Sequence, residues 1–376
     1  MVQTVLRAGL AWEWETFPQY LDALDRRRFS MDVAAHIGHV ALRTYVMGGR
    51  GIANEPASSQ DIAQMARLAR EAVDAGALGF STSRVKAHVT LAGDPVPGTH
   101  AREDELFAIG RAIAEAGKPV VFQVASAGID GQDPEDALRE IEWMRRLAVE
   151  TKIPVSFLVL QAFTAPGLWK DLLDAAIAAE KEGGKLRAQV ANRPFGMLLG
   201  LTTRHPFMKR PTYHRLAQAT KSLAALVAEL RKPEIRAAIL SEPDSVSTGD
   251  KYEGIGLLVS PMSTMVYPLQ DDLDYEPTPD RSVDGLCKAR GCSPLELFYD
   301  LLLEDGGRRL LSFAVANYHG GDHAVAHAML AHPTSLVGLA DGGAHSGLIC
   351  DSGQPTFLLT HWTRDRTRGP RFAAGE

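Results

Sequence analysis

The stretch that decides the fold is residues 336–351, LVGLADGGAHSGLICD, in which a short apolar run stops at Asp341 and two glycines follow directly. Such a run is typical of a buried strand that carries a carboxylate at its end. Gly342 and Gly343 permit backbone angles closed to other residues, so the chain can turn back beside the carboxylate and leave room for a ligand. An ordinary Asp-Gly turn also explains the dipeptide taken alone. Its position after several strand-helix units favours the first interpretation.

Upstream of this stretch, strand-like and helix-like segments alternate. Parallel strands joined by helices produce this order, and apolar runs suit strands that are covered on both faces. We therefore predict an α/β fold, a (β/α)8 TIM-type barrel that is incomplete, with about six strands and with strands 1 and 2 missing. The predicted strands are residues 33–42, 76–81, 119–126, 154–161, 186–190 and the run from 336, and the predicted helices are 17–27, 59–75, 103–116, 134–151 and 170–181.

Residues 200–300 break this alternation, because prolines interrupt them and only the segments 216–230 and 233–240 look helical. We interpret the region as a mixed helical, lid-like excursion before the last strand. A helix is expected to restart at Pro294, because Ser293 can cap it and Glu296 stands three residues further on. The prediction is one partial barrel domain over residues 1–376.

Composition is that of an ordinary soluble chain, with 45% hydrophobic and 23% charged residues and a formal net charge of −6. The sequence has no basic stretch interleaved with aromatic residues, so it does not predict a nucleic-acid partner. No apolar segment of about 20 residues predicts a membrane span, and no leader pattern is present, so a cytoplasmic protein is expected. The cysteines are too few for a disulfide frame. The expected partner is a small neutral or anionic molecule, and the pattern does not indicate an oligomeric state.

Consecutive predicted strands place amide side chains near one end. The amides are Gln123, Gln161 and Gln189, and Arg193 follows the last of them. A buried amide without a partner costs about 1–3 kcal/mol, so these groups are expected to bond to one another, to backbone or to ligand. A structural network and a substrate pocket both fit this pattern. His345, four residues after Asp341, is either a further pocket residue or a loop histidine that faces water.

Two pairs of histidines lie close together in the sequence. His323 and His327 are four residues apart on a predicted helix, a spacing that can chelate zinc, but Ala324 stands where the HExxH motif has its glutamate. His36 and His39 flank a predicted strand and are expected to point to opposite faces. Neither pair is predicted to hold a metal ion. No Gly-x-Ser-x-Gly elbow, Walker loop or strand-bound GxGxxG is found.

Several segments together resemble the D-aminoacylase branch, the N-acyl-D-amino-acid deacylases, of the amidohydrolase superfamily. The resemblance runs along nearly the whole chain and is most specific in its last segment. The segments are WEWETFPQYLDAL (12–24), HIGHVALRTYVMG (36–48), GALGFSTSR (76–84), PVPGTHAREDEL (95–106), AQVANRPFGMLLGL (188–201) and GLADGGAHSGLICDSGQPTFLLTHWTRDR (338–366).

The resemblance implies a metal-dependent hydrolase of linear amide C–N bonds. Complete members add a small β-sandwich to the barrel, and this chain is expected to lack it. By the same resemblance, Asp341 binds or adjoins a divalent metal ion, with zinc the expected metal, and acts as the general base that takes the proton of the attacking water. Gln123, Gln161, Arg193 and His345 are then expected to line the substrate pocket, where Arg193 can grip a substrate carboxylate.

The chain departs from the family pattern at the metal site. Family members carry a His-x-His on strand 1, a Cys after strand 2 and histidines on strands 5 and 6, whereas this sequence has Gln123 and residues 159–161 at the last two places. An amide is a poor zinc ligand, so the other metal ligands are expected to lie outside this chain. An open barrel exposes sheet edges, so the isolated chain is expected to be poorly active. Two alternatives stay open, a catalytically impaired barrel for binding or assembly and an amidohydrolase for cyclic amides.

Overall fold

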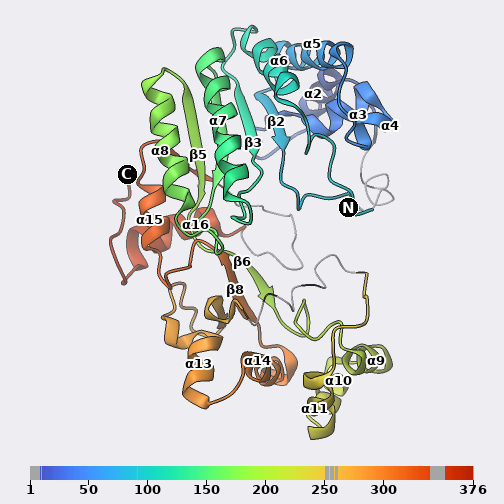
Figure 1. The fold of residues 1–376 in the computed structure, drawn as a ribbon, viewed down its shortest axis with the longest axis vertical. Helices are drawn as coiled ribbons and strands as arrows, with labels where there is room; N and C mark the ends of the chain where they lie inside the picture. Colours follow the sequence, from blue (N-terminus) through green and yellow to red (C-terminus); the bar gives the residue numbers. More distant parts are fainter. Residues whose placement is uncertain are drawn as a thin grey trace. The chain divides into compact units, whose positions relative to one another are not determined.

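The computed structural model describes residues 9, 11–90, 92–249, 254, 258, 261–338 and 352–375 (Figure 1). Asp341 and His345 therefore lie outside the described residues. The chain divides into two compact units. Unit 1 comprises Met1–Val159, Gly167–Gln189 and His332–Leu336, and unit 2 comprises Leu160–Pro166, Val190–Ala331 and Val337–Glu376.

A six-stranded sheet organises unit 1, with the strand order β1-β2-β3-β4-β5-β9. The first four strands pair in parallel, and Gln123 lies opposite Ser156 across the β3-β4 pair. The predicted α/β class and the six strands are confirmed; the described residues show an open sheet rather than a closed barrel. The strands are β1 (Ile37–Gly38), β2 (Gly79–Ser83), β3 (Val121–Ala125), β4 (Pro154–Val159), β5 (Lys185–Ala191) and β9 (Ser335–Gly338).

Helices pack in series along this sheet, each against the next (Figure 1). The ends of these helices follow local signals. Ser58 and Asp61 form a capping box at the start of α5 (Ser59–Ala75), and Asp133 caps α7 (Pro134–Thr151), which begins with a proline. These signals explain why the predicted helices are found within two residues of their expected ends. The helices are α5 (Ser59–Ala75), α6 (Glu103–Ala114), α7 (Pro134–Thr151) and α8 (Leu168–Lys181), with α2 (Phe17–Asp25) before them.

The strand predicted at residues 33–42 is wrong over most of its length. Only β1 is extended, and α3 (His39–Met47) begins immediately after it. The buried positions of this segment include His39, Leu42 and Arg43, which recur at helical spacing. His39 opens a helix, so the expected alternation of His36 and His39 across a strand does not apply.

Three buried charged or polar side chains tie α3 to α6. The Nε2 atom of His39 lies 2.7 Å from Oε1 of Glu105, and the guanidinium of Arg43 donates to both oxygens of that carboxylate at 2.7 and 2.5 Å. The other nitrogen of His39 is 2.8 Å from the hydroxyl of Thr82 on β2. Burial acts to raise the pKa of Glu105, but the hydrogen bonds and charges of His39 and Arg43 outweigh it and lower that pKa. The carboxylate therefore stays ionised inside the protein.

Unit 2 is built on a three-stranded antiparallel sheet in the order β6-β8-β7, with short helices on its flanks (Figure 1). Its strands are β6 (Phe195–Leu199), β7 (Val266–Pro268) and β8 (Leu311–Ala316). Its helices are α9 (Pro211–Ala219), α10 (Leu223–Leu230), α11 (Pro233–Ser241), α13 (Val283–Arg290), α14 (Pro294–Leu302), α15 (Ala324–Leu330) and α16 (Gln354–Thr360), followed by the π-helical turn η5 (His361–Asp365). No helix among the described residues is long and apolar enough to cross a bilayer.

The helix predicted at residues 216–230 is two helices. Thr220 leaves helical geometry, and the side chain of Ser222 accepts a hydrogen bond from the N–H of Ala225, which starts α10. The helix predicted to restart at Pro294 is confirmed, because Ser293 and Glu296 form the expected capping box. The lid-like role of this region and the single domain over residues 1–376 stay predictions.

Replacing His205 by glutamine is expected to flatten the dependence of the unfolding free energy on pH. Burial lowers the pKa of His205 to about 3, and its Nδ1 atom accepts a hydrogen bond from the N–H of Phe207 at 3.2 Å. The unfolded side chain takes up a proton below about pH 6.5. The contribution of a neutral His205 is therefore fully present above that pH and is lost at about 1.4 kcal/mol per pH unit as the pH falls toward 3.

Urea unfolding at pH 7, 6, 5 and 4 measures this effect. The control is His100→Gln, which makes the same change at an exposed histidine. An unaltered slope in His205→Gln would show that His205 does not stay neutral in the folded protein.

Candidate active site

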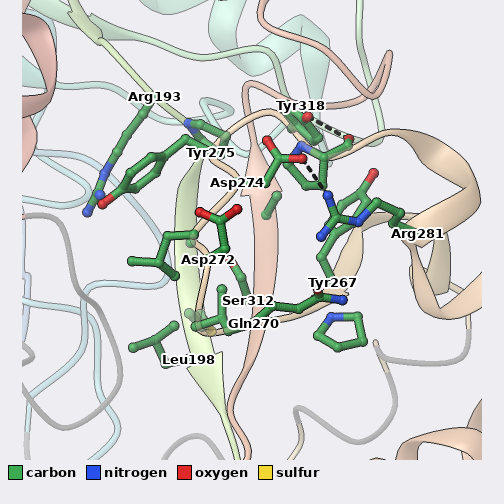
Figure 2. A pocket seen from close by; sticks show the side chains of 18 of the residues that line it. Arg193, Leu198, Tyr267, Gln270, Asp272, Asp274, Tyr275, Arg281, Ser312 and Tyr318 are labelled. Atoms are coloured by element: carbon green, nitrogen blue, oxygen red, sulfur yellow. Dashed lines mark hydrogen bonds and ion pairs between the residues drawn. The ribbon is translucent and has the colours of Figure 1, made fainter. Parts of the chain in front are cut away.

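A cavity of about 350 Å³ lies in unit 2 between its small sheet and the loop that follows β7 (Figure 2). One part of its wall is apolar, and another carries acidic, guanidinium and phenol groups. The apolar residues include Met197, Leu198, Leu269, Leu273 and Leu286, and the polar ones include Arg193, Tyr267, Asp272, Asp274, Arg281 and Tyr318. Such a mixture of a large apolar surface and a few polar groups is typical of a small-molecule site.

The loop on the cavity rim is held by side chains that bond across it. Arg281 donates to the carboxylate of Asp274 at 2.7 Å, and the hydroxyl of Tyr318 donates to the carbonyl oxygen of Pro277 at 2.8 Å (Figure 2). These bonds fix the backbone on both sides of Glu276. The position of that carboxylate is therefore set by the same loop that lines the cavity.

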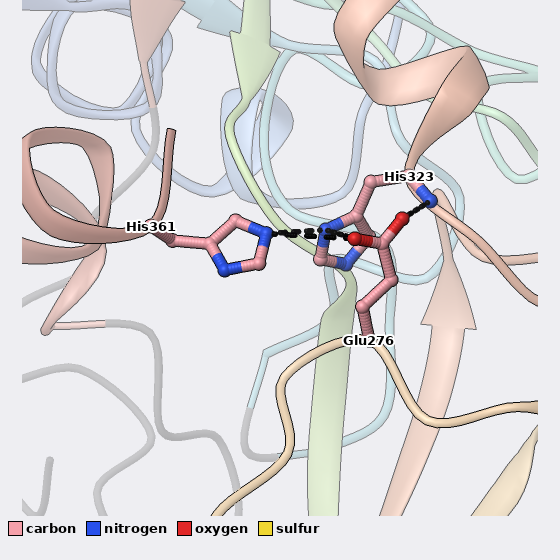
Figure 3. A group of neighbouring side chains, drawn as sticks. All are labelled: Glu276, His323 and His361. Carbon is pink, nitrogen blue, oxygen red and sulfur yellow. Dashed lines mark hydrogen bonds and ion pairs between the residues drawn. The ribbon is translucent and has the colours of Figure 1, made fainter. Parts of the chain in front are cut away.

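Glu276, His323 and His361 form a buried group, called the Glu276 cluster below (Figure 3). The Nδ1 atom of His323 and the Nε2 atom of His361 are 3.2 Å apart. Oε2 of Glu276 lies 3.9 Å from the first nitrogen and 3.8 Å from the second. Tyr318, whose side chain lines the cavity, packs edge-on against the His323 ring at 5.2 Å. The cluster and the cavity thus share a wall.

Arg366 also pairs with the carboxylate of Glu276. Its Nε donates to Oε2 and one Nη donates to Oε1, both at 3.1 Å. The guanidinium lies 4.8 Å from the ring centroid of Trp362 and also donates to the carbonyl of Pro370. Arg366 is therefore anchored independently of Glu276, and it holds that side chain in one orientation.

Both imidazoles of the cluster favour the neutral form. Burial lowers the pKa of His323 well below its usual value, and the charges of His361 and Arg366 lower it further. Burial also lowers the pKa of His361, although Glu276 acts in the opposite direction. Two neutral imidazoles and one carboxylate are a donor set that suits a divalent transition metal. Within the described ranges this is the one group of three such side chains whose ligand atoms lie within 4.8 Å of one another.

Arg193 is the predicted site residue that the structure places at the cavity. It follows β5 and lines the wall next to β6. Its guanidinium lies 5.9 Å from the ring centroid of Phe357, and that ring stacks on His361 at 4.5 Å. Arg193 is thus joined to the Glu276 cluster through one aromatic ring.

Gln161 is buried in unit 2 but is not among the residues lining this cavity. Its side-chain oxygen accepts a hydrogen bond from the N–H of His319 at 3.2 Å. Its own N–H donates to the side-chain oxygen of Asn317 at 2.8 Å. These bonds secure the chain after β8, so Gln161 has a clear structural role.

Gln123 lies in unit 1 and bonds to another amide. Its side-chain nitrogen donates to the side-chain oxygen of Gln189 at 3.5 Å, and Gln189 donates to the hydroxyl of Ser156 at 3.3 Å. The three side chains come from β3, β4 and β5 and therefore stand on one face of the sheet. Gln123 and Gln189 are thus hydrogen-bonded to each other, and the role of Gln123 as a pocket residue stays a prediction.

Sequence reasoning missed Glu276 and His361. It considered His323 with His327, but His323 precedes α15 as its N-cap, and His327 instead stacks on Phe372 at 4.5 Å. The partners of His323 stand 47 and 38 residues away in the sequence. The signal that was available is the resembled segment 338–366, which contains His361.

The chain belongs to the amidohydrolase family, whose sequence profile matches residues 4–373. The predicted superfamily is therefore confirmed. Hydrolases of this family act on carbon–nitrogen bonds.

Particular relatives are more distant. D-aminoacylase of Alcaligenes xylosoxydans xylosoxydans is 27% identical over 151 residues, which cover 40% of this chain and 28% of that protein. An uncharacterized protein of Mycobacterium tuberculosis is 24% identical over 352 residues, which cover 88% of this chain and 53% of that protein. The chain thus spans about half the length of these curated relatives, or less.

The similarities to solved structures are also distant and cover only part of each chain. The chain is similar to N-acyl-D-glutamate deacylase from Bordetella bronchiseptica, complexed with zinc and a phosphonate inhibitor, with a TM-score of 0.44, 17% identity, and coverage of 86% of this chain and 51% of that one. It is also similar to L-hydantoinase from Arthrobacter aurescens, with a TM-score of 0.30, 18% identity, and coverage of 48% and 37%.

Proposed function

We propose that this chain is a metal-dependent hydrolase of linear amide C–N bonds, of the N-acyl-D-amino-acid deacylase type. The observation that carries the proposal is the family match over residues 4–373. The unit 2 cavity supports it, because an apolar wall suits an acyl group and Arg193 offers a guanidinium for a carboxylate. Amide substrates with both features are N-acylated amino acids.

Asp341 is the proposed general base and metal-site carboxylate. Asp341 would hold or adjoin a divalent metal ion, with zinc the proposed metal, and that ion would supply Lewis acidity. The carboxylate of Asp341 takes the proton from the attacking water and passes it to the departing amine. Gln123, Gln161 and His345 are proposed pocket residues, and the bonds of the two glutamines favour a positioning role for them.

The test is release of free amino acid from N-acetyl-D-amino acids by the purified chain, with added zinc and after treatment with a chelator. Matched N-acetyl-L-amino acids and a hydantoin test stereochemistry and the alternative of cyclic amides. Release that is stimulated by metal and confined to linear D-substrates supports the proposal. Hydantoin opening alone would favour the cyclic-amide alternative, and no turnover of any substrate would favour a binding or assembly role.

Arg193→Gln is expected to raise KM for N-acyl amino acids by about tenfold to a hundredfold. A hydrogen-bonded pair between charged groups contributes about 1.5–3 kcal/mol, which is lost when the guanidinium is removed. The same change should have little effect on N-acyl amines, which lack the carboxylate. Steady-state kinetics with both substrate types measure the difference.

The control variant for this experiment is Arg187→Gln. Arg187 lies on β5 as well, but it pairs with Glu180 and does not line the cavity. Equal losses on both substrate types in Arg193→Gln would contradict carboxylate recognition by this side chain.

A further inference from the structure

We infer that Glu276, His323 and His361 bind one divalent transition-metal ion, and that these three side chains are sufficient to hold it. The inference goes beyond the hydrolase proposal, since neither Asp341 nor catalysis enters into it. It rests on the spacing of the donor atoms, on a free lone pair of the carboxylate and on the way the packing fixes each side chain.

The spacing of the two imidazole nitrogens already matches coordination. In a tetrahedral site with metal–nitrogen distances of about 2.05 Å, neighbouring donors lie about 3.3 Å apart. The Nδ1 atom of His323 and the Nε2 atom of His361 are 3.2 Å apart. Oε2 of Glu276 is 3.8 and 3.9 Å from these nitrogens, so it needs to move by only about half an ångström to complete a three-donor face.

The hydrogen bonds of Glu276 leave the required lone pair available. Oε1 accepts from the backbone N–H of His323 at 2.7 Å and from Arg366, whereas Oε2 accepts one hydrogen bond, from Arg366. A carboxylate offers about four acceptor sites, two on each oxygen. The site that remains belongs to Oε2, the oxygen that the two imidazole nitrogens approach.

Packing pre-organises the donors. His323 holds Glu276 through its backbone N–H and contributes its ring to the same cluster. The ring of His361 stacks on Phe357 at 4.5 Å with an interplanar angle of 14°. Side chains that are fixed in this way lose little conformational entropy when an ion binds.

Arg366 limits the affinity and does not supply a donor. Its charge opposes a dication, while its two hydrogen bonds keep the carboxylate of Glu276 in place, the role that outer partners have in metal sites. Asp274 and Asp365 offset part of that charge, since both act on His361 with the opposite sign. Two imidazole donors favour zinc or cobalt over magnesium or calcium, which prefer oxygen ligands.

Titration of the metal-free full chain with Co²⁺, followed by visible absorption and by equilibrium dialysis, tests the inference. About one equivalent is expected to bind, and His361→Ala and Glu276→Gln are each expected to weaken binding at least tenfold. His327→Gln should bind Co²⁺ like the unaltered chain, because His327 lies on α15 outside the cluster. Circular dichroism of each variant confirms folding, and His323→Asn is a second variant if one of them fails to fold.

Unchanged Co²⁺ affinity in both His361→Ala and Glu276→Gln would overturn the inference. Loss of the cobalt spectrum in Asp341→Asn would overturn it as well, because the three residues would then not suffice. Failure of the hydrolase proposal has a different signature, which is Co²⁺ binding as expected together with no turnover of N-acyl amino acids.

Discussion

Asparagine in place of Asp341 is expected to lower kcat for hydrolysis of N-acetyl-D-amino acids by about a thousandfold. A positioned general base contributes about 10²–10⁴ to the rate, and the amide of asparagine cannot take the proton of water. Metal bound at the Glu276 cluster is expected to stay in this variant, because Asp341 is not among its three donors. The measurement is steady-state kinetics with zinc in excess, with the metal content determined on the same samples.

Asp171→Asn is the control for this experiment. Asp171 lies exposed in the first turn of α8, and its replacement removes a charge of the same sign without touching the proposed site. Activity of Asp341→Asn within a factor of three of the unaltered chain would rule out Asp341 as the base. Full metal content with lost activity would assign the loss to proton transfer.

Alanine in place of Glu105 is expected to lower the unfolding free energy by about 3–5 kcal/mol. The substitution leaves Arg43 inside unit 1 without the carboxylate that accepts its two hydrogen bonds, and it removes the partner of His39. An uncompensated buried charge is the reason that breaking one half of such a pair costs this much. Urea unfolding at pH 7 measures the effect.

Glu103→Ala is the matched control, since Glu103 stands in the same first turn of α6 but is half exposed and pairs with Arg146. A surface pair of this kind contributes about 0–1 kcal/mol. The double variant Glu105→Leu with Arg43→Met is expected to recover part of the stability, because it removes both charges together. A loss below about 1 kcal/mol in Glu105→Ala would mean that Arg43 finds water or another partner.

Local signals decided which parts of the fold could be predicted. Helices α5 and α7 have capping residues within three positions of their first turn, so the sequence alone places their ends. The segment around β1 has no such capping residues, and its short apolar run fits a strand and a buried helix equally well. The break between α9 and α10 was missed because Ser222 stands inside an otherwise helical pattern.

The sequence predicted a residue of the candidate site only where that residue comes directly after a strand. Arg193 was found because it stands just after β5, whereas the Glu276 cluster joins a loop, a helix N-terminus and a π-helical turn. No periodicity relates such positions, since their proximity depends on how the chain folds over long sequence distances. The amides of Gln123 and Gln189 show the converse case: regular spacing predicted that they lie together, and one hydrogen bond joins them in the structure.

The link between Arg366 and Glu276 makes the last part of the chain necessary for a loop that stands 90 residues earlier. Proteolysis between Thr360 and Arg366 would separate Arg366 from Glu276 and leave the backbone N–H of His323 as the remaining donor to that carboxylate. Damage at the carboxyl end would therefore be felt at the side chain of Glu276, far from the cleaved bond in sequence, while Arg281 and Tyr318 still hold the loop on either side of it.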